Sequence, residues 1–371
     1  MTLTLTDTLA ARVQRIQALA SRIDRPVRFM EVCGTHTMAA FQSGLRSLLP
    51  PSVSLLSGPG CPVCVTPVRY IDIALALAQL PDITICSFGD MIRVPGSDSS
   101  LEKERARGAT VRVVYSPMDA LQEAAAHPER RVVFLGVGFE TTAPATAWVI
   151  RRAAQDGIKN LRMLSAHKTM PTALRALVQS GLVDIDGFLL PGHVSAILGL
   201  APYEFLCREF QLSCVIAGFE ADDMLKGIEQ LLLQRVESRA VVENAYPRGV
   251  PDSGNQEALA AIQEIFEPCV AEWRGLGLIP DSGLKLRKAY AGFDAERDVP
   301  ESVTAHALEP AACRCGDVLR GLITPMQCPL FECACTPSTP IGACMVSSEG
   351  ACAAYYKYAR HRVSLSKAGS G

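Results

Sequence analysis

Two cysteines near the start of the chain have the spacing of a redox pair. Cys61 and Cys64 lie three residues apart in the run GPGCPVC at 58–64. In dithiol exchange sites with this spacing, one thiolate attacks a disulfide and the other resolves the mixed disulfide. The glycines and prolines around the pair predict a tight turn. The same two thiols could instead supply half of a zinc site, or could be inert.

A second motif, CGTHT at 33–37, places a thiol and an imidazole three residues apart. A thiolate from Cys33 and a nitrogen from His36 could reach one metal ion, with nearby hydroxyl and backbone N–H groups polarising its other ligands. A Cys–His nucleophile pair is a second interpretation. A buried cysteine beside a capping threonine is the structural alternative.

Three further loops carry acidic or imidazole side chains. Glu140 lies in GFETTAP at 138–144, where hydrogen bonding or proton transfer competes with a helix start capped by threonine, with Pro144 in the first turn. His167 follows in SAHK and His193 in PGHVS, and each suits either a structural or a catalytic role. Glu140 and His193 join the candidate catalytic residues.

Half of the fourteen cysteines lie between residues 313 and 352. The spacing Cys313-x14-Cys328-x6-Cys335-x16-Cys352 predicts the four thiolates of a [4Fe–4S] cluster, because structural zinc usually shows short CxxC knuckles that are missing here. Cys315 and Cys344 are alternative ligands. Cys333 is the predicted spare thiol, although its closeness to Cys335 leaves both open. This proline-rich segment needs something other than a hydrophobic core to order it.

The elements that must position these residues read as an α/β fold with parallel strands, because short β-branched runs alternate with helical patterns. The runs form two sets of four, and each member of the second set follows its counterpart by roughly 100 to 110 residues, which predicts two similar Rossmann-like halves facing a central cleft. The predicted strands are 27–32, 52–57, 83–88, 111–116, 131–137, 161–166, 187–191 and 213–219. Loops at the carboxyl ends of such strands carry the candidate residues.

Four segments follow from this interpretation. Residues 1–24 form an N-terminal amphipathic helix, 25–122 the first α/β domain, 123–245 the second, and 246–371 a helical linker followed by a loop-rich cluster domain. Within the linker, the pattern at 257–273 predicts a helix.

The composition restricts the cellular compartment and the classes of binding partner that we expect. The chain of 371 residues has 20% charged residues and a formal charge of −2, which argues against a nucleic-acid surface built on bulk charge. We expect no signal peptide and no membrane span, since no apolar run approaches the roughly 20 residues that a bilayer requires. A cytoplasmic protein with clustered cysteines is more typical of metal or redox chemistry than of structural disulfides.

The motifs CGTHT, GPGCPVC, GFETTAP and PGHVS, with the tail CPLF…CTPSTPIGACMVSSEGACAAYYKY, occur in an order that resembles the HypD family of hydrogenase maturation proteins. The resemblance extends over nearly the whole chain. It implies a cytoplasmic scaffold that assembles the Fe(CN)2CO group of [NiFe] hydrogenases with a HypC-type chaperone. HypE, together with HypF, would supply cyanide, and the hydrogenase large subunit would receive the product indirectly.

The same resemblance implies a division of labour among the residues. Cys33 would hold the assembling iron beside His36, Cys61 and Cys64 would form the redox pair, and the tail would bind the [4Fe–4S] cluster. Electrons would then pass from cluster to dithiol to iron, with Glu140, His167 and His193 around the iron site. The protein would be a scaffold with redox activity rather than a conventional turnover enzyme. The alternatives are a stand-alone iron–sulfur thiol–disulfide oxidoreductase and a zinc-stabilised interaction protein.

Overall fold

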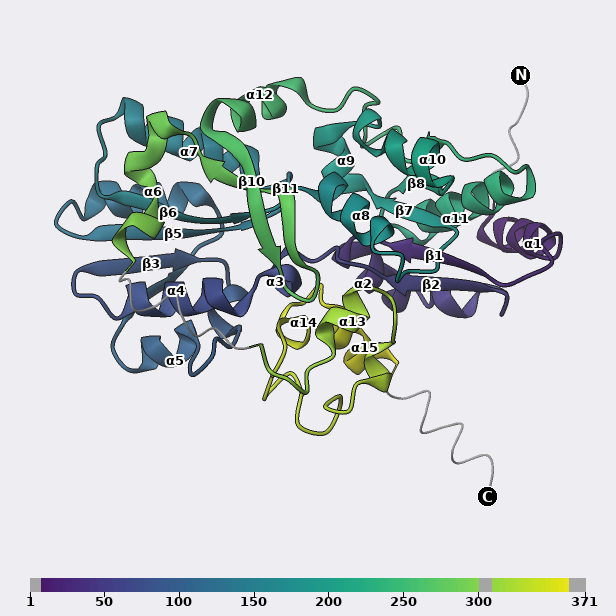
Figure 1. The fold of residues 1–371 in the computed structure, drawn as a ribbon, viewed down its shortest axis with the longest axis horizontal. Helices are drawn as coiled ribbons and strands as arrows, with labels where there is room; N and C mark the ends of the chain where they lie inside the picture. Colours follow the sequence, from purple (N-terminus) through teal and green to yellow (C-terminus); the bar gives the residue numbers. More distant parts are fainter. Residues whose placement is uncertain (1–7, 300–308, 360–371) are drawn as a thin grey trace.

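The computed structural model describes residues 8–299 and 309–359 as an α/β protein with two parallel sheets lying side by side (Figure 1). Sheet A has the strand order β2-β1-β7-β8-β9, and sheet B has the order β4-β3-β5-β6. The strands of sheet A are β1 (Val27–Glu31), β2 (Val53–Ser57), β7 (Gly187–Pro191), β8 (Ser213–Ala217) and β9 (Val242–Asn244). Those of sheet B are β3 (Ile83–Ser87), β4 (Thr110–Val113), β5 (Arg131–Gly138) and β6 (Leu161–His167).

The predicted α/β class is confirmed, and a strand occurs in each of the eight predicted segments, but the division between the two halves differs. The chain leaves sheet A after β2, builds all of sheet B, and returns at β7. There Met30 pairs with Phe188, so β7 occupies the second edge of β1. A boundary at 122/123 would cut sheet B between β4 and β5. Strands buried on both faces look alike in sequence, so their spacing does not identify their neighbours.

Helices cover both faces of the sheets (Figure 1). Apart from the N-terminal helix, each follows a strand or links two strands, as parallel pairing requires. Those along sheet A are α1 (Leu9–Ala20), α2 (Gly34–Gln42), α3 (Pro62–Val65), α8 (Met170–Gln179), α9 (Gly192–Leu198), α10 (Glu204–Phe210) and α11 (Ala221–Val236). Those along sheet B are α4 (Val68–Ala78), α5 (Leu101–Ala106), α6 (Pro117–Ala126), α7 (Ala143–Gln155) and α12 (Gln256–Ile265).

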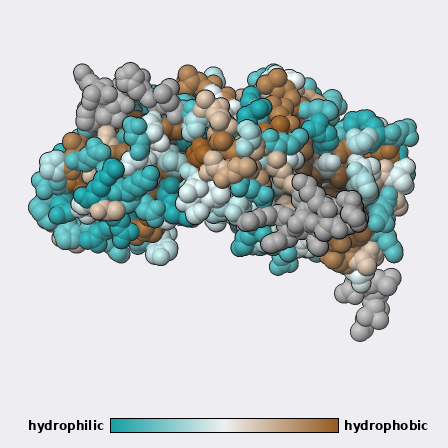
Figure 2. Space-filling model, turned by 90° about the horizontal axis from the view of Figure 1, so that it is seen from below, coloured by the Kyte–Doolittle hydropathy of each residue, from teal (hydrophilic) through white to brown (hydrophobic). Residues whose placement is uncertain are grey.

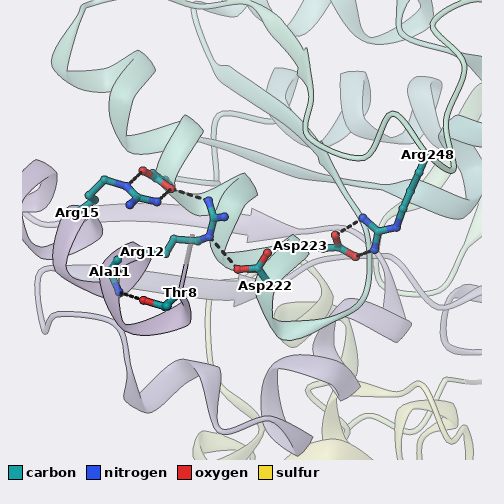
Figure 3. Close-up of polar contacts among 8 residues, drawn as sticks. Thr8, Ala11, Arg12, Arg15, Asp222, Asp223 and Arg248 are labelled. Carbon is teal, nitrogen blue, oxygen red and sulfur yellow. Dashed lines mark hydrogen bonds and ion pairs between the residues drawn. The ribbon is translucent and has the colours of Figure 1, made fainter. Parts of the chain in front are cut away.

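Ion pairs fasten the N-terminal helix to α11. Arg12 contacts Asp222 at 2.9 Å and Glu229 at 2.8 Å, and Arg15 also pairs with Glu229 (Figure 3). Arg12 is buried, so its guanidinium is held by carboxylates on both sides rather than by water. Between the two helices Ile16 and Leu225 are fully buried in the core over sheet A. The predicted amphipathic segment therefore lies against the outer helix layer.

The predicted helix at 257–273 is wrong in its second half. Helix α12 ends at Ile265, and a hairpin of β10 (Phe266–Trp273) and β11 (Gly277–Leu286) follows. Pro268 cannot donate the helical hydrogen bond, and the side chains of β10 alternate in burial, as a strand requires. The hairpin runs between the two sheets (Figure 1) and bonds to both sides, from Thr169 N–H to Ser282 O and from Arg274 N–H to Val65 O.

Residues 309–359 form a small loop-rich unit below the junction of the two sheets (Figure 1). Its helices are short: α13 (Cys315–Leu319), α14 (Ala343–Val346) and α15 (Ala351–Tyr358). Seen from this lower side, the sheet B end of the surface is mainly hydrophilic, and hydrophobic residues gather towards the middle (Figure 2). Within the described ranges, no helix has both the length and the apolar character needed to cross a membrane.

Candidate metal and dithiol site

Two neighbouring strands bring the cysteine motifs together. β1 and β2 are paired in parallel through Glu31 and Ser57, so the loops after them leave the same edge of sheet A. Gly34 N–H donates to Gly60 O at 3.0 Å. A Cβ atom at Gly60 would lie 2.2 Å from the backbone nitrogen of Cys33. Only glycine permits this approach, which gives the GPGC sequence a structural reason.

Cys61 and Cys64 form a disulfide with Cα atoms 5.2 Å apart. Cys61 caps α3, and its sulfur accepts the Cys64 N–H at 3.2 Å, with Pro62 in the first turn. The two side chains are almost completely buried, at 3% and 0% exposure. Ser347 is 3.3 Å from the Cys61 sulfur and lies at the end of α14. The C-terminal unit therefore contacts the pair directly.

Cys33 lies at the start of α2 with its thiol against the first helical turn. Burial raises the pKa of Cys33 to about 11; the Glu349 carboxylate also raises it, whereas hydrogen bonds from the His36 N–H and from Thr35 lower it. Thr35 in turn donates to Glu349 Oε1 at 2.7 Å. The thiol is neutral at pH 7, so binding a metal cation must release its proton.

The His36 ring points away from the expected shared position. Its Nε2 lies 2.9 Å from Gly218 O and 3.2 Å from Ala217 O, which places the ring proton there. Burial lowers the pKa of His36 to about 4, so the ring is neutral. Its Nδ1 is buried with no hydrogen-bond partner among the described residues. The contact that joins His36 to Cys33 is its backbone N–H.

His193 packs on the same aromatic ring as His36. It stacks on Phe219 at 3.9 Å between ring centroids, and Phe219 lies 4.9 Å from the His36 ring. Burial lowers the pKa of His193, and the Glu349 charge opposes that shift. The Phe219 loop leads into α11, where Asp223 is held by Arg248 (Figure 3).

Glu140 is a buried carboxyl group with one unused oxygen. Its Oε1 accepts the Met170 N–H at 2.8 Å, whereas Oε2 has no hydrogen-bond partner among the described residues. Burial raises the pKa of Glu140 to about 7. Thr142 is the N-cap residue of α7, as the alternative predicted, but its hydroxyl donates back to Phe139 O and makes no capping hydrogen bond. Pro144 does occupy the first turn of α7.

His167 lies apart from these groups. Its nitrogens are 3.3 Å from Thr146 Oγ1 and 3.4 Å from Ser165 Oγ, and its ring packs on Phe266. Burial lowers the pKa of His167 to about 4. These contacts belong to the packing of sheet B under the hairpin, so the expected convergence includes His36 and His193 but not His167.

A three-residue segment of the tail, 347–349, was not among the predicted site residues. Ser347 contacts Cys61, Ser348 donates to Asp90 Oδ2 at 2.9 Å, and Glu349 accepts from Thr35. The segment thus touches the loops after three strands. These three residues belong to the tail motif. Each is more than 250 residues from its partner along the chain, so no local sequence pattern could predict the contacts.

The tail cysteines form a second thiol site. A small cavity, also lined by Leu330, Phe331 and Met345, is surrounded by six of the seven thiols. They are the four predicted ligands and both alternatives: Cys313, Cys315, Cys328, Cys335, Cys344 and Cys352. The seventh, Cys333, is exposed and does not line it. Soft sulfur donors around an apolar cavity fit an iron–sulfur cluster.

Four of these thiols contact one another in a row, Cys315 bonding to Cys313 and Cys344, and Cys344 also bonding to Cys352. The Cys315 and Cys344 sulfurs lie 2.6 Å apart, and both are buried. No group of three or more His, Cys, Asp or Glu side chains in residues 8–299 and 309–359 is arranged to hold a single metal ion.

Comparisons with known proteins agree over almost the full length. Residues 7–359 match the HypD family, described as a hydrogenase formation hypA family. The chain is 49% identical over 346 residues to hydrogenase maturation factor HypD2 of Bradyrhizobium diazoefficiens, with 91% of each chain covered. It is 48% identical over 351 residues to hydrogenase maturation factor HypD of Escherichia coli, covering 93% of this chain and 92% of the relative. The HypD of Rhodobacter capsulatus is 44% identical, with 94% of each chain covered.

Proposed function

The chain belongs to the HypD family of hydrogenase maturation factors, and we propose that it is the scaffold on which iron receives its cyanide and carbonyl ligands. Cys33 would hold the cargo iron, and a HypC-type chaperone would supply a further ligand from its own chain. HypE with HypF would deliver cyanide, and the large subunit of a [NiFe] hydrogenase would receive the finished group, all in the cytoplasm.

The contact between the Cys33 loop and the dithiol loop carries this proposal. Through Gly34 and Gly60 the two loops share a hydrogen bond and direct backbone contact. A thiolate donor stabilises the low-spin Fe(II) that strong-field ligands favour. A redox pair beside it can keep that iron reduced. Burial of both thiol groups keeps water away from the attachment step.

The second thiol site is the proposed electron supply. A [4Fe–4S] cluster bound by Cys313, Cys328, Cys335 and Cys352 would supply single electrons. That assignment leaves Cys315 and Cys344 as a buried pair of thiols. When they exchange with the Cys61–Cys64 disulfide, two thiols lose two protons and two electrons, and the dithiol of Cys61 and Cys64 gains them. Cys344 belongs to α14, which packs on α3 and ends at Ser347.

Two buried groups, Glu140 and His36, are suited to proton handling. The Glu140 carboxyl has a pKa of about 7 and a free oxygen, so it can hold or release a proton near neutral pH. The unpartnered Nδ1 of neutral His36 can accept one. His193 is accessible beside it and would exchange protons with solvent.

Infrared spectroscopy of the anaerobically purified complex with its chaperone tests the iron site. We expect cyanide and carbonyl stretching bands in the wild type and their loss in Cys33→Ala. The matched control is Cys86→Ala, which removes a buried thiol from β3 and should leave the bands in place. Bands that survive Cys33→Ala, or that are missing from the wild-type complex, contradict the scaffold role.

A stand-alone thiol–disulfide oxidoreductase is the second candidate, favoured by the disulfide itself. It would reduce a disulfide substrate repeatedly without the chaperone. The near-complete burial of Cys61 and Cys64 favours the scaffold over this activity, because exchange with a protein substrate needs an accessible sulfur. Steady reduction of a model disulfide by the isolated protein, unaffected by Cys33→Ala, would reverse that preference.

A further inference from the structure

A second cavity lies along the hairpin and shares no lining residue with the cavity of the tail thiols. It has a volume of about 380 Å³ and is bounded by β10 and β11, by the end of β6 and by the start of α4. Most of its polar lining is charged or nucleophilic. The members that matter here are Arg69, Lys168, Cys269, Glu272, Lys285 and Glu296.

Lys168 is the buried member of this set. Its side chain follows β6, and the residue is only 3% exposed. The ammonium nitrogen donates to Glu272 O at 2.7 Å and lies 5.4 Å from the centroid of the Trp273 ring. Among residues 8–299 and 309–359, no carboxylate lies within ion-pair distance of it. A lysine buried with a carbonyl and a ring face but no counterion holds its positive charge poorly.

The electrostatics agree with that geometry. Burial lowers the pKa of Lys168 to about 8, and the charges of Glu272 and Cys269 only partly oppose it. A large share of the side chain is therefore the neutral amine at slightly alkaline pH. Neutral amines in dry cavities are the lysines that add to carbonyl groups.

We propose that this cavity binds a small carbonyl compound, a 2-oxo acid or an aldehyde, and that Lys168 holds it as an imine. The amine lone pair adds to the carbonyl carbon, and the nitrogen loses two protons as the oxygen leaves in water. No electrons are transferred, so the step needs no redox partner. Glu296 lines the same cavity, and burial raises the pKa of its carboxyl, so it can protonate the departing oxygen.

The neighbouring groups define the binding surface. Ala271 and Leu278 give the cavity an apolar wall on the hairpin, and Arg69 lines its opposite side from α4. The cation would attract the carboxylate of a 2-oxo acid. Cys269 is a competing nucleophile, but burial raises the pKa of its thiol and keeps it protonated.

Reductive trapping tests the site on the full-length protein. Pyruvate with cyanoborohydride at pH 8 converts an imine into a stable amine, and peptide mass spectrometry locates it. We expect Lys168 to be modified at least about tenfold faster than Lys285, because burial lowers the pKa of Lys168 to about 8. Lys168→Arg should abolish that adduct, since arginine retains a donor for Glu272 O but forms no imine. The control Lys285→Arg should leave it unchanged.

Two results overturn the proposal. The first is that Lys168 stays unmodified in the folded wild type while surface lysines react. Its role would then be limited to holding the hairpin through Glu272 O. The second is equal labelling of all lysines, which would show that Lys168 is not a selective imine-forming site. The wild-type map decides this even if Lys168→Arg fails to fold. A parallel reaction with propanal shows whether the carboxylate is needed. Neither outcome depends on hydrogenase maturation.

Discussion

The two thiol sites are built in opposite ways. Around Cys33 and Cys61, strand ends of a buried parallel sheet set the positions, and backbone contact through Gly60 fixes them. Around the six-thiol cavity there are only short helices and loops, and the thiols themselves fill much of the interior. The first site is preformed by the fold. The second must gain its order from what the thiols bind.

The sharpest test of this contrast removes one tail thiol. Cys335→Ser takes away a buried thiol of the cavity, and we expect loss of the proposed cluster together with unfolding of residues 309–359. Iron analysis, absorbance near about 400 nm and limited proteolysis of the anaerobic protein would show it. Cys333→Ser is the matched control, because that thiol is exposed and outside the cavity. Equal effects of the two substitutions would contradict the ligand assignment.

Substituting a cysteine of the dithiol should abolish maturation without affecting the cluster or the fold of the tail. Cys64→Ser leaves the sheet and the tail cavity intact, so we expect iron content and proteolytic resistance to stay at wild-type levels. Hydrogenase maturation should fall by at least about 100-fold, because one thiol cannot complete the exchange. Activity of the hydrogenase in cells that carry the variant measures this. Loss of iron from Cys64→Ser would contradict the separation of the dithiol site from the cluster site.

The preformed site can also be broken through its backbone. Gly60→Ala places a Cβ atom against Cys33, where nothing flexible can yield, and we expect a loss of about 3 kcal/mol in unfolding free energy. Urea denaturation measures the loss. Gly89→Ala is a fair comparison, since Gly89 lies in the loop after β3 of sheet B and its Cβ would lie an ordinary 3.7 Å from Val113. A neutral Gly60→Ala would mean that the two loops are not held by contact.

The same contrast explains what could be predicted from the sequence. The strands were predictable because apolar, β-branched runs of the right length stand between turn residues, and their ends located Cys33, Cys61 and Glu140. Sheet membership was not predictable, because β7 and β3 are both buried along their whole length, yet only β7 pairs with β1. The hairpin was missed because no glycine or proline separates α12 from β10, and Pro268 lies inside the strand rather than at its start.

Long-range contacts were beyond local patterns as well. Glu349 and Ser347 complete the first site from the far end of the chain, and no periodicity connects them to Thr35 or Cys61. The direction of the His36 ring depends on the carbonyl of Gly218, which sheet A brings to it. The spacing of three residues predicted that Cys33 and His36 lie close together. It did not predict that the backbone N–H of His36, rather than its ring, makes the contact.

The smallest expected effect concerns the buried charge of Glu140. The pKa of Glu140 is about 7 in the folded protein, whereas its ordinary value is 4.5. Between pH 4.5 and pH 7 the carboxyl group is therefore protonated in the folded state and ionised in the unfolded state. The contribution of Glu140 to stability therefore falls as pH rises from 4.5 to 7. Glu140→Gln keeps an oxygen for the Met170 N–H and never ionises. It should be more stable than the wild type by about 2 kcal/mol at pH 8 and nearly equal to it at pH 4.5.

Urea unfolding followed by tryptophan fluorescence suits this measurement, because Trp273 stacks on Phe139 beside the carboxyl group. The buried His36 and His167, whose pKa values are lowered to about 4, destabilise both proteins as pH falls from 6.5 to 4. Their effect cancels in the difference between wild type and variant. A gap that is the same at pH 4.5 and pH 8 would show that Glu140 stays ionised in the folded protein, and would remove it from the proton-handling groups.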